Sequence, residues 1–340
     1  MARLGVLATR LRLRIARQRL IARAVRSRRR LRPVTDRTAR IAAGDILCFV
    51  TLRNEGPRLA FFLDYYRALG VRHFLVVDNA STDGGGAYLR TQPDVSLWWT
   101  DAGYRAARFG MDWMNGLLRR HGRGHWCLTV DPDEFLVYPH MEDRPLPALT
   151  AWLDDIGRRS FPAMLLDLYP RGPVEAAVCP EGRNPLEVAR WFDPANYTIH
   201  RNDHFGNLWI QGGPRMRAFF GDDPRSAPAL NKIPLVQWAA RNAYVSATHM
   251  LLPRGLNRVY DEDGGERIAG CLLHPKFLSG LGAKSAEEAD RRQHYADGRE
   301  YRAYRDGLHH GAGLWCAESR EYRDWRQLED LGLLSSGNWA

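Results

Sequence analysis

The sequence predicts an α/β fold: a mostly parallel sheet with flanking helices. Two observations indicate this fold. Between residues 46 and 130, four short apolar runs alternate with three segments of helical periodicity. Three of the four runs are followed directly by polar or acidic residues. Such alternation is typical of parallel strands joined by crossover helices, and ligands of such sheets bind beyond the carboxyl ends of the strands.

The first strand and helix are the clearest of these elements. Residues 46–52 read Ile-Leu-Cys-Phe-Val-Thr-Leu, a continuous apolar run that predicts a buried strand. Pro57 suits the first turn of a helix, and apolar residues at helical spacing follow until Gly70 ends it. Residues 73–77 predict the second strand.

The remaining elements are predicted in the same way. The sequence up to the fourth strand favours a short helix after residues 84–86, a strand at 95–99, a helix at about 105–120 and a strand at 126–130. Beyond the fourth strand the pattern is mixed. It favours a helix at 149–156 and strands at 163–169, 230–235, 244–249 and 271–277. It also favours an irregular insertion at 170–205, a loop entering a strand at 212–219, and a polar helix from the capping box Ser285 and Glu288 to about 304.

The positive charge of the chain lies in an Arg-rich N-terminal segment. The 340 residues carry a net charge of +10. Residues 1–40 hold fourteen Arg and one acid, a local charge of +13, which leaves −3 for the remainder. Apolar residues within 1–32 recur at loosely helical spacing, which suits peripheral contact with an anionic membrane. A disordered, solvated tail is the alternative, and the lack of aromatic residues among the arginines disfavours nucleic acid.

The rest of the composition indicates a cytoplasmic protein, or one held at the inner face of a membrane. No apolar run reaches the roughly 18 residues that a membrane-spanning helix needs. The N-terminal segment lacks the continuous apolar core and the cleavage site of a secretory signal. The five cysteines are scattered without a CxxC spacing, which favours free thiols in a reducing compartment.

An acidic segment follows the fourth strand. Asp131 and Asp133 are two residues apart, so an extended backbone would send both side chains to the same face, and Pro132 between them restricts the backbone. Two hard oxygen ligands suit Mg²⁺ or Mn²⁺, which often shares its coordination with substrate phosphates. A solvated acidic turn is the alternative, because Asp and Pro favour turns.

These motifs together resemble family 2 glycosyltransferases of the GT-A fold. The likeness is to the bacterial branch with a DxDEF form of the metal motif, and it covers residues 46–137 well and the stretch to Phe277 loosely. The motifs are Asn54-Glu55, Tyr65-Tyr66, Leu69-Gly70, Val77-Asp78-Asn79-x-Ser81-Thr82-Asp83-Gly84 and Asp131-x-Asp133-Glu134-Phe135.

The resemblance implies a nucleotide-diphosphate-sugar donor and a saccharide or lipid-linked acceptor. It implies that Asp131 and Asp133 hold a divalent cation, Mn²⁺ or Mg²⁺, that neutralises the leaving diphosphate. It implies a C-terminal histidine as a further metal or diphosphate ligand, for which His274 is the best match and His249 the competitor. The residues expected at the donor are Thr51, Asn54, Glu55, Asp78, Asp83, Arg215, Lys232 and Lys276. For Asp83, a structural role as an acidic cap near a helix start is the alternative.

Two observations place basic residues in this set of expected donor-binding residues. Only three of the 49 basic residues are lysines, and Lys232 and Lys276 are two of them, which suggests positions where a compact ammonium is needed. Arg215 and Arg217 are two residues apart in a predicted strand after Gly212, and the alternatives are that both face the diphosphate or that both lie on a solvated strand edge.

The catalytic base is not identified by any motif. The resemblance implies an inverting reaction, in which a carboxylate deprotonates the acceptor. Asp193 and Asp203 are weak candidates, and Asp222 and Asp223 compete with them.

We expect a basic segment at 1–44, a glycosyltransferase domain at 45–310 and an extension at 311–340. Within the domain, 45–140 would bind the nucleotide sugar and 141–280 the acceptor. A nucleotidyltransferase that makes sugar nucleotides is one alternative, although it would need more glycines after the first strand. A non-catalytic membrane- or RNA-associated adaptor on the same fold is the other.

Overall fold

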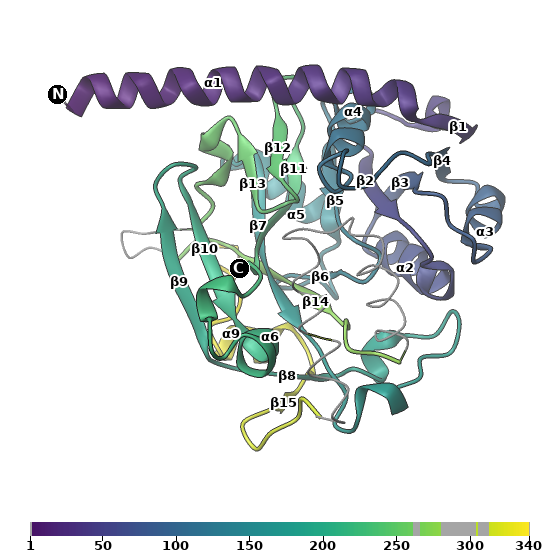
Figure 1. Ribbon diagram of the computed structural model, residues 1–340, viewed down its shortest axis with the longest axis vertical. Helices are drawn as coiled ribbons and strands as arrows, with labels where there is room; N and C mark the ends of the chain where they lie inside the picture. Colours follow the sequence, from purple (N-terminus) through teal and green to yellow (C-terminus); the bar gives the residue numbers. More distant parts are fainter. Residues whose placement is uncertain (1, 261–265, 280–303, 305–312, 340) are drawn as a thin grey trace.

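The computed structural model describes residues 2–260, 266–279, 304 and 313–339, and its centre is a nine-stranded sheet (Figure 1). In spatial order the strands are β1 (Arg32–Thr35), β4 (Val95–Trp99), β3 (Val71–Asp78), β2 (Ile46–Leu52), β5 (Trp126–Thr129), β11 (Asn231–Gln237), β7 (Ser160–Asp167), β14 (Gly270–His274) and β6 (Phe135–Val137). Six of them run in one direction, while β1, β11 and β6 run in the other.

Helices and three small two-stranded sheets surround the central sheet. The helices are α1 (Ala2–Ser27), α2 (Gly56–Ala68), α3 (Gly85–Thr91), α4 (Met111–His121), α5 (Leu146–Asp155), α6 (Gly213–Phe219) and α9 (Trp325–Asp330). The small sheets pair β9 (Tyr197–Asn202) with β10 (Asn207–Gly212), β12 (Ala243–Ser246) with β13 (Met250–Leu252), and β8 (Trp191–Phe192) with β15 (Arg320–Glu321). Short 3-10 helices are η1 (Arg28–Arg30), η2 (Thr38–Arg40), η3 (Val174–Ala176), η4 (Pro185–Glu187), η5 (Pro224–Ser226) and η6 (Arg254–Asn257).

The predicted α/β fold is confirmed. Strands β4, β3, β2 and β5 are adjacent and parallel, and the helices that connect them in sequence are α2, α3 and α4. Alternate residues of β2 enter two different cores. Cys48 and Val50 pack with α2 and α5 on one face, whereas Leu47 and Phe49 pack with α4 on the other. Burial on both faces explains why this strand is apolar throughout.

The second half of the sheet is mixed. Strand β11 enters between β5 and β7 and is antiparallel to both, while β14 is parallel to β7. The expected insertion at 170–205 holds short elements: η3, η4, β8 and most of β9. The polar helix expected from Ser285 lies outside the described residues.

Two expectations about local structure are wrong. Residues 213–219 form helix α6 instead of a strand, because Gly212 and Gly213 turn the chain with positive φ (149° and 67°) and Pro214 suits a first helical turn. The helix expected from about 105 begins only at Met111. Arg108, Phe109 and Gly110 precede it with φ of 55°, 57° and 76°, values that no helix continues through.

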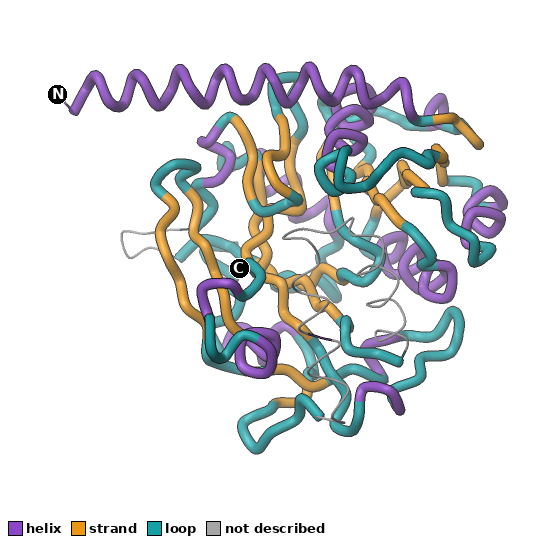
Figure 2. The backbone as a smooth tube through the Cα atoms, in the orientation of Figure 1, coloured by secondary structure: helices purple, strands orange, loops and turns teal. Residues whose placement is uncertain are grey.

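The Arg-rich N-terminal segment is a continuous helix that packs on the body. Helix α1 contacts α4, β12 and β13, and Figures 1 and 2 show it crossing one side of the molecule, with its N-terminal end projecting beyond the rest. Leu13 and Ala24 are buried against the body. Arg23 forms an ion pair with Asp112 of α4 (Nη2–Oδ2 2.8 Å). Among the described residues, no helix is long and apolar enough to cross a membrane.

Candidate active site

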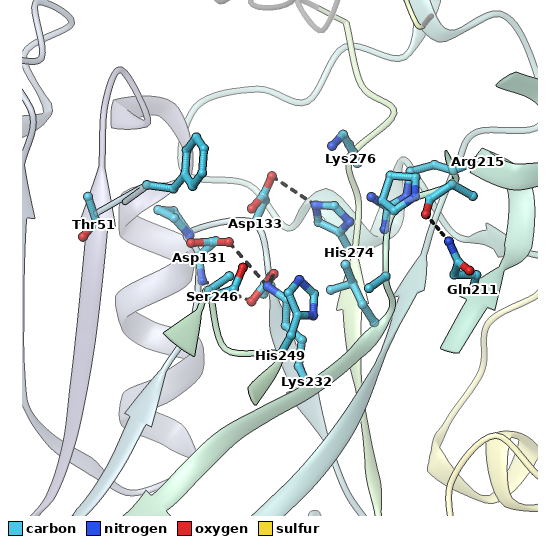
Figure 3. Close-up of a pocket in the computed structure, with 18 of the residues that line it drawn as sticks. Thr51, Asp131, Asp133, Gln211, Arg215, Lys232, Ser246, His249, His274 and Lys276 are labelled. Atoms are coloured by element: carbon cyan, nitrogen blue, oxygen red, sulfur yellow. Dashed lines mark hydrogen bonds and ion pairs between the residues drawn. The ribbon is translucent and has the colours of Figure 1, made fainter. Parts of the chain in front are cut away.

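A pocket of about 860 Å³ lies beyond the carboxyl ends of β2 and β5. Because β11 is antiparallel to β5, the beginning of β11 reaches the same edge of the sheet. The end of β14 and the turn between β12 and β13 complete the wall. Figure 3 shows that acidic and basic side chains from these separate segments meet in the middle of this pocket.

The acidic segment forms a turn. The amide of Glu134 donates to the carbonyl of Asp131 (3.0 Å), and the amide of Asp131 donates to the Glu134 carboxylate (3.2 Å). The expectation of an extended backbone is therefore wrong, because the chain reverses toward β6 at Pro132. Asp131 and Asp133 still line the same pocket, and the Asp131 side chain is 57% exposed.

Lys232 lies between two of these carboxylates. Its Nζ forms a buried ion pair with Glu134 and is 3.5 Å from Asp131 Oδ2. Burial lowers the pKa of Lys232, but Glu134 and Asp131 raise it more, so the amine stays charged. Burial also raises the pKa of Glu134, and Lys232 offsets only part of that shift. The lysine thus places a fixed positive charge at the floor of the pocket.

Arg58, at the start of α2, contacts the other carboxylate of the acidic turn. Its Nη1 is 3.3 Å from Asp133 Oδ2, and its Nε is 3.2 Å from Glu55 Oε2. Burial lowers the pKa of Arg58, but Glu55 and Asp133 more than compensate. Asp133 is therefore held in place from the N-terminal end of α2.

His274 has a carboxylate at each ring nitrogen. Its Nδ1 lies 2.7 Å from Asp167 Oδ1, and its Nε2 lies 3.4 Å from Asp133 Oδ2. Asp167 in turn accepts from Arg215 Nε at 2.6 Å. A carboxylate at Nδ1 fixes the proton there and directs Nε2 toward Asp133. Burial lowers the pKa of His274, but Asp133 and Asp167 raise it above its ordinary value.

His249 lines the same pocket in a different environment. Its Nδ1 lies 2.6 Å from the carbonyl oxygen of Asn231, which can only accept, so Nδ1 carries the proton. Its ring packs near Trp209, with centroids 6.0 Å apart. Burial, together with the charge of Lys232, lowers the pKa of His249 to about 4. His249 is therefore a neutral imidazole at neutral pH.

The donor atoms present suit a hard divalent cation in part. Asp133 Oδ2 and His274 Nε2 are a carboxylate oxygen and an imidazole nitrogen 3.4 Å apart, and Asp131 lines the pocket beside them. Among the described residues there is no group of three His, Cys, Asp or Glu side chains arranged to hold a metal ion. The set therefore fits an ion that takes its remaining ligands from bound phosphates, as Mg²⁺ commonly does.

Most of the residues predicted from the sequence line this pocket. They are Thr51, Glu55, Asp131, Asp133, Arg215, Lys232, His274 and Lys276, together with the competitor His249. Arg215 and Arg217 do not project together as expected. Arg215 is buried against Asp167, whereas Arg217 pairs with Asp193 (Nε–Oδ2 3.0 Å) away from the pocket lining.

Three predicted donor residues are instead engaged by the loops at the ends of β2 and β3. Asp78 is buried and accepts from the amide of Ser81 (2.8 Å). Asp83 accepts from the amides of Gly56 and Gly85 (2.6 and 3.0 Å). Asn54, with φ of 52°, accepts from the amide of Thr82 (2.8 Å). These contacts shape the rim, and none of the three predicted residues belongs to the pocket lining.

The two weak candidates for the base also lie outside the pocket lining. Asp193 is buried in a separate cluster, where it accepts from Tyr169 Oη and from Arg217. Asp203 sits at the tip of the β9–β10 hairpin with its side chain 88% exposed.

Asp167 and Arg58 contact residues of the candidate site, and the sequence reasoning missed both. Asp167 lies in an apolar strand, Ala-Met-Leu-Leu-Asp-Leu-Tyr, and a carboxylate within such a run was the available signal, since a buried acid needs a partner. Arg58 had no such signal, because it is one of many arginines.

No family model matches this chain, and no curated protein matches it. Among solved structures, it is similar to a mannosyltransferase from Pyrobaculum calidifontis in complex with GDP-Man and Mn²⁺, with 16% identity and a TM-score of 0.30 over 92% of this chain and 82% of that one. It is also similar to a UDP-glucose pyrophosphorylase from Acinetobacter baumannii, with 10% identity and a TM-score of 0.28 over 77% of this chain and 98% of that one. Both TM-scores are below 0.5, so the fold and the site rest on this chain's own sheet and residues.

Proposed function

We propose that this protein is a metal-dependent glycosyltransferase that moves a sugar from a nucleotide-diphosphate donor to a saccharide or lipid-linked acceptor. The observation that carries the proposal is the convergence of Asp131, Asp133 and His274 in one pocket at the carboxyl edge of the sheet. An open α/β sheet binds its ligand at this edge. A volume of about 860 Å³ is within the usual range for small-molecule and cofactor sites.

The arrangement of charge supports a diphosphate ligand. Asp133 and His274 would hold Mn²⁺ or Mg²⁺, with Asp131 beside them, and the bound ion would supply Lewis-acid stabilisation to the leaving nucleoside diphosphate. Lys276 also lines the pocket and can offer an ammonium to a phosphate oxygen. Lys232 pairs with Glu134 and lies near Asp131, so it compensates part of the negative charge of the acidic turn.

The two sides of the pocket support a division between donor and acceptor. Thr51 and Glu55 at the end of β2 lie on the side of the parallel strands, where a nucleoside would bind. The opposite wall comes from β10 and the segment 225–229, and it includes Trp209. A sugar ring can pack its C–H face against an indole, so this wall suits the acceptor.

A donor screen tests the proposal directly. The full-length protein is incubated with a panel of nucleotide-diphosphate sugars, and nucleoside-diphosphate release is measured with EDTA, with Mg²⁺ and with Mn²⁺. We expect release with at least one donor, only when the metal is present. Asp133→Ala should lower the rate by about a hundredfold or more, since a metal ion contributes several kcal/mol to such a transition state.

The matched control is Asp155→Ala, an exposed aspartate at the end of α5. This variant should retain parent activity. Equal rates for Asp133→Ala and the parent would contradict the metal assignment. Release of pyrophosphate from a nucleoside triphosphate and a sugar phosphate, without turnover of any nucleotide sugar, would instead establish the nucleotidyltransferase alternative.

A further inference from the structure

Helix α1 carries two apolar stripes on opposite faces. Successive residues of a helix are about 100° apart, so positions separated by three or four residues share a face. Leu13 and Ala24 belong to the inner stripe, and both are buried against the body. The backbone comes especially close at Gly116 of α4, where a Cβ atom would lie 3.0 Å from the carbonyl oxygen of Ala24. The inner stripe thus anchors the helix.

The outer stripe faces away from the body. Its apolar residues are Leu11, Ile15, Ala22 and Val25, the polar Gln18 lies among them, and all five are exposed. The Leu11 side chain is 59% exposed and that of Ile15 is 44% exposed. Large apolar residues on the solvent side of a helix are costly to leave in water when they share one face. Packing within the described chain therefore does not account for this face.

Arginines border the outer stripe on both sides. Arg12, Arg19 and Arg26 recur every seven residues along one flank, and Arg10 and Arg14 lie on the other. All five are exposed. There is no acidic residue in the helix. An apolar strip between two cationic borders is the arrangement that lets a helix lie in the interface of an anionic bilayer.

The distribution of charge over the whole protein favours the same orientation. Residues 1–40 carry +13, whereas the remainder carries −3. An anionic surface attracts the helix and weakly repels the body, so it would orient the molecule with α1 toward it.

The position of α1 also connects this face to the pocket. The helix packs against β12 and β13, and the turn between these strands supplies Ala247 and His249 to the pocket wall. The β12–β13 hairpin would therefore lie between a surface bound by α1 and the pocket.

We propose that the outer stripe and its bordering arginines dock this protein on the surface of an anionic lipid bilayer. The arginines bind lipid phosphates, and Leu11, Ile15 and Val25 enter the boundary between headgroups and acyl chains. The inner stripe keeps the body attached to the docked helix. This inference is independent of the reaction, because it rests on α1 and on the distribution of charge, and not on the pocket residues.

Vesicle co-sedimentation tests the proposal with the full-length protein. The probes are vesicles of phosphatidylcholine alone and of phosphatidylcholine mixed with phosphatidylglycerol. We expect binding to the mixed vesicles only. Leu11→Gln combined with Ile15→Gln should lower the partition coefficient about tenfold. Arg12→Gln, Arg19→Gln and Arg26→Gln together should lower it about a hundredfold, at roughly 1 kcal/mol per arginine.

Two matched controls separate these effects from general surface changes. Ile156→Gln combined with Ile199→Gln removes two exposed isoleucines elsewhere, and Arg72→Gln, Arg90→Gln and Arg241→Gln together remove three exposed arginines. Both controls should bind vesicles like the parent. The far-ultraviolet circular dichroism and melting temperature of every variant should match the parent, because none of these side chains packs in a core.

Several results would overturn the proposal. Equal binding to neutral and mixed vesicles would exclude recognition of anionic lipid. Unchanged binding of the Leu11 and Ile15 variant would exclude insertion of the outer stripe. Binding to RNA but not to mixed vesicles would reassign the arginines to nucleic acid. A dimer that the Leu11 and Ile15 variant loses, without vesicle binding by the parent, would reassign the stripe to self-association.

Discussion

His274 and His249 line the same pocket, yet their surroundings are opposite (Figure 3). His274 lies between the carboxylates of Asp133 and Asp167, which raise its pKa. His249 is half-buried beside a backbone carbonyl and near the charge of Lys232, and desolvation lowers its pKa to about 4. From the sequence, His274 is the better match to a metal-binding histidine and His249 is its competitor. Their partners separate them, because only His274 directs a ring nitrogen at an acidic side chain of the turn.

The sharpest test replaces each histidine in turn. His274→Ala should weaken Mn²⁺ binding by about a hundredfold or more, because it removes a proposed ligand while leaving both aspartates of the turn. His249→Ala should change that affinity by less than about threefold, since it contributes no ligand. Titration of Mn²⁺ in the presence of a nucleoside diphosphate, followed by electron paramagnetic resonance, measures both. Equal losses in the two variants would remove the distinction.

The second test changes Asp167, the carboxylate that contacts His274 Nδ1. Asp167→Asn takes the carboxylate from Nδ1, so we expect Mn²⁺ affinity to fall about tenfold. It also leaves Arg215 without its buried counter-charge, so the free energy of unfolding should fall by about 3 kcal/mol. Combining Asp167→Asn with Arg215→Gln should recover much of the stability but not the affinity. Recovery of both would mean that Asp167 acts only through folding.

The third test concerns the pH dependence of stability. His249 has a pKa of about 4 in the folded protein and about 6.5 in an unfolded chain. Between these values the unfolded chain binds more protons, so the free energy of unfolding rises as pH rises from 4 to 6.5. We expect His249→Gln to show a shallower rise over this range in urea unfolding. Identical slopes in parent and variant would show that His249 does not stay neutral when buried.

The smallest effect is expected at Asp203, which lies outside the pocket lining that holds both histidines. Its side chain is exposed at a hairpin tip, so Asp203→Asn should change the free energy of unfolding by less than about 0.5 kcal/mol. Turnover in the donor assay should also stay within about twofold of the parent. A collapse of turnover with Mn²⁺ binding intact would mean that the hairpin supplies the base.

The parts of the fold that were predictable from sequence are those with local signals. The strand at 46–52, its helix and the strand after it follow from periodicity and from Pro57 and Gly70 alone. Residues 213–219 form a helix where the sequence predicted a strand, because Gly-Gly-Pro is compatible with a turn into either element. The packing of α1 on α4 depends on a contact with Gly116 that no pattern within residues 1–32 contains.

The candidate site divides in the same manner. Asp131 and Asp133 are two residues apart in the chain, so their proximity could be expected from the sequence. Asp78 and Asp83 matched a motif, but the turns beside them use their oxygens as hydrogen-bond acceptors, and the sequence does not reveal this choice. In the sequence, Asp167 is only an acidic residue within an apolar strand. Its partner His274 lies on another strand more than a hundred residues later, so the pairing is visible only in the folded chain.

The antiparallel entry of β11 has a consequence for synthesis on the ribosome. Strand β5 pairs with β2 on one side, and its other side stays an open edge until residues 231–237 have emerged. An open apolar edge can pair with another chain, so the nascent N-terminal half is exposed to misassembly during this interval. The same late strand delivers Lys232, so the Glu134 carboxylate acquires its counter-charge only when that edge closes.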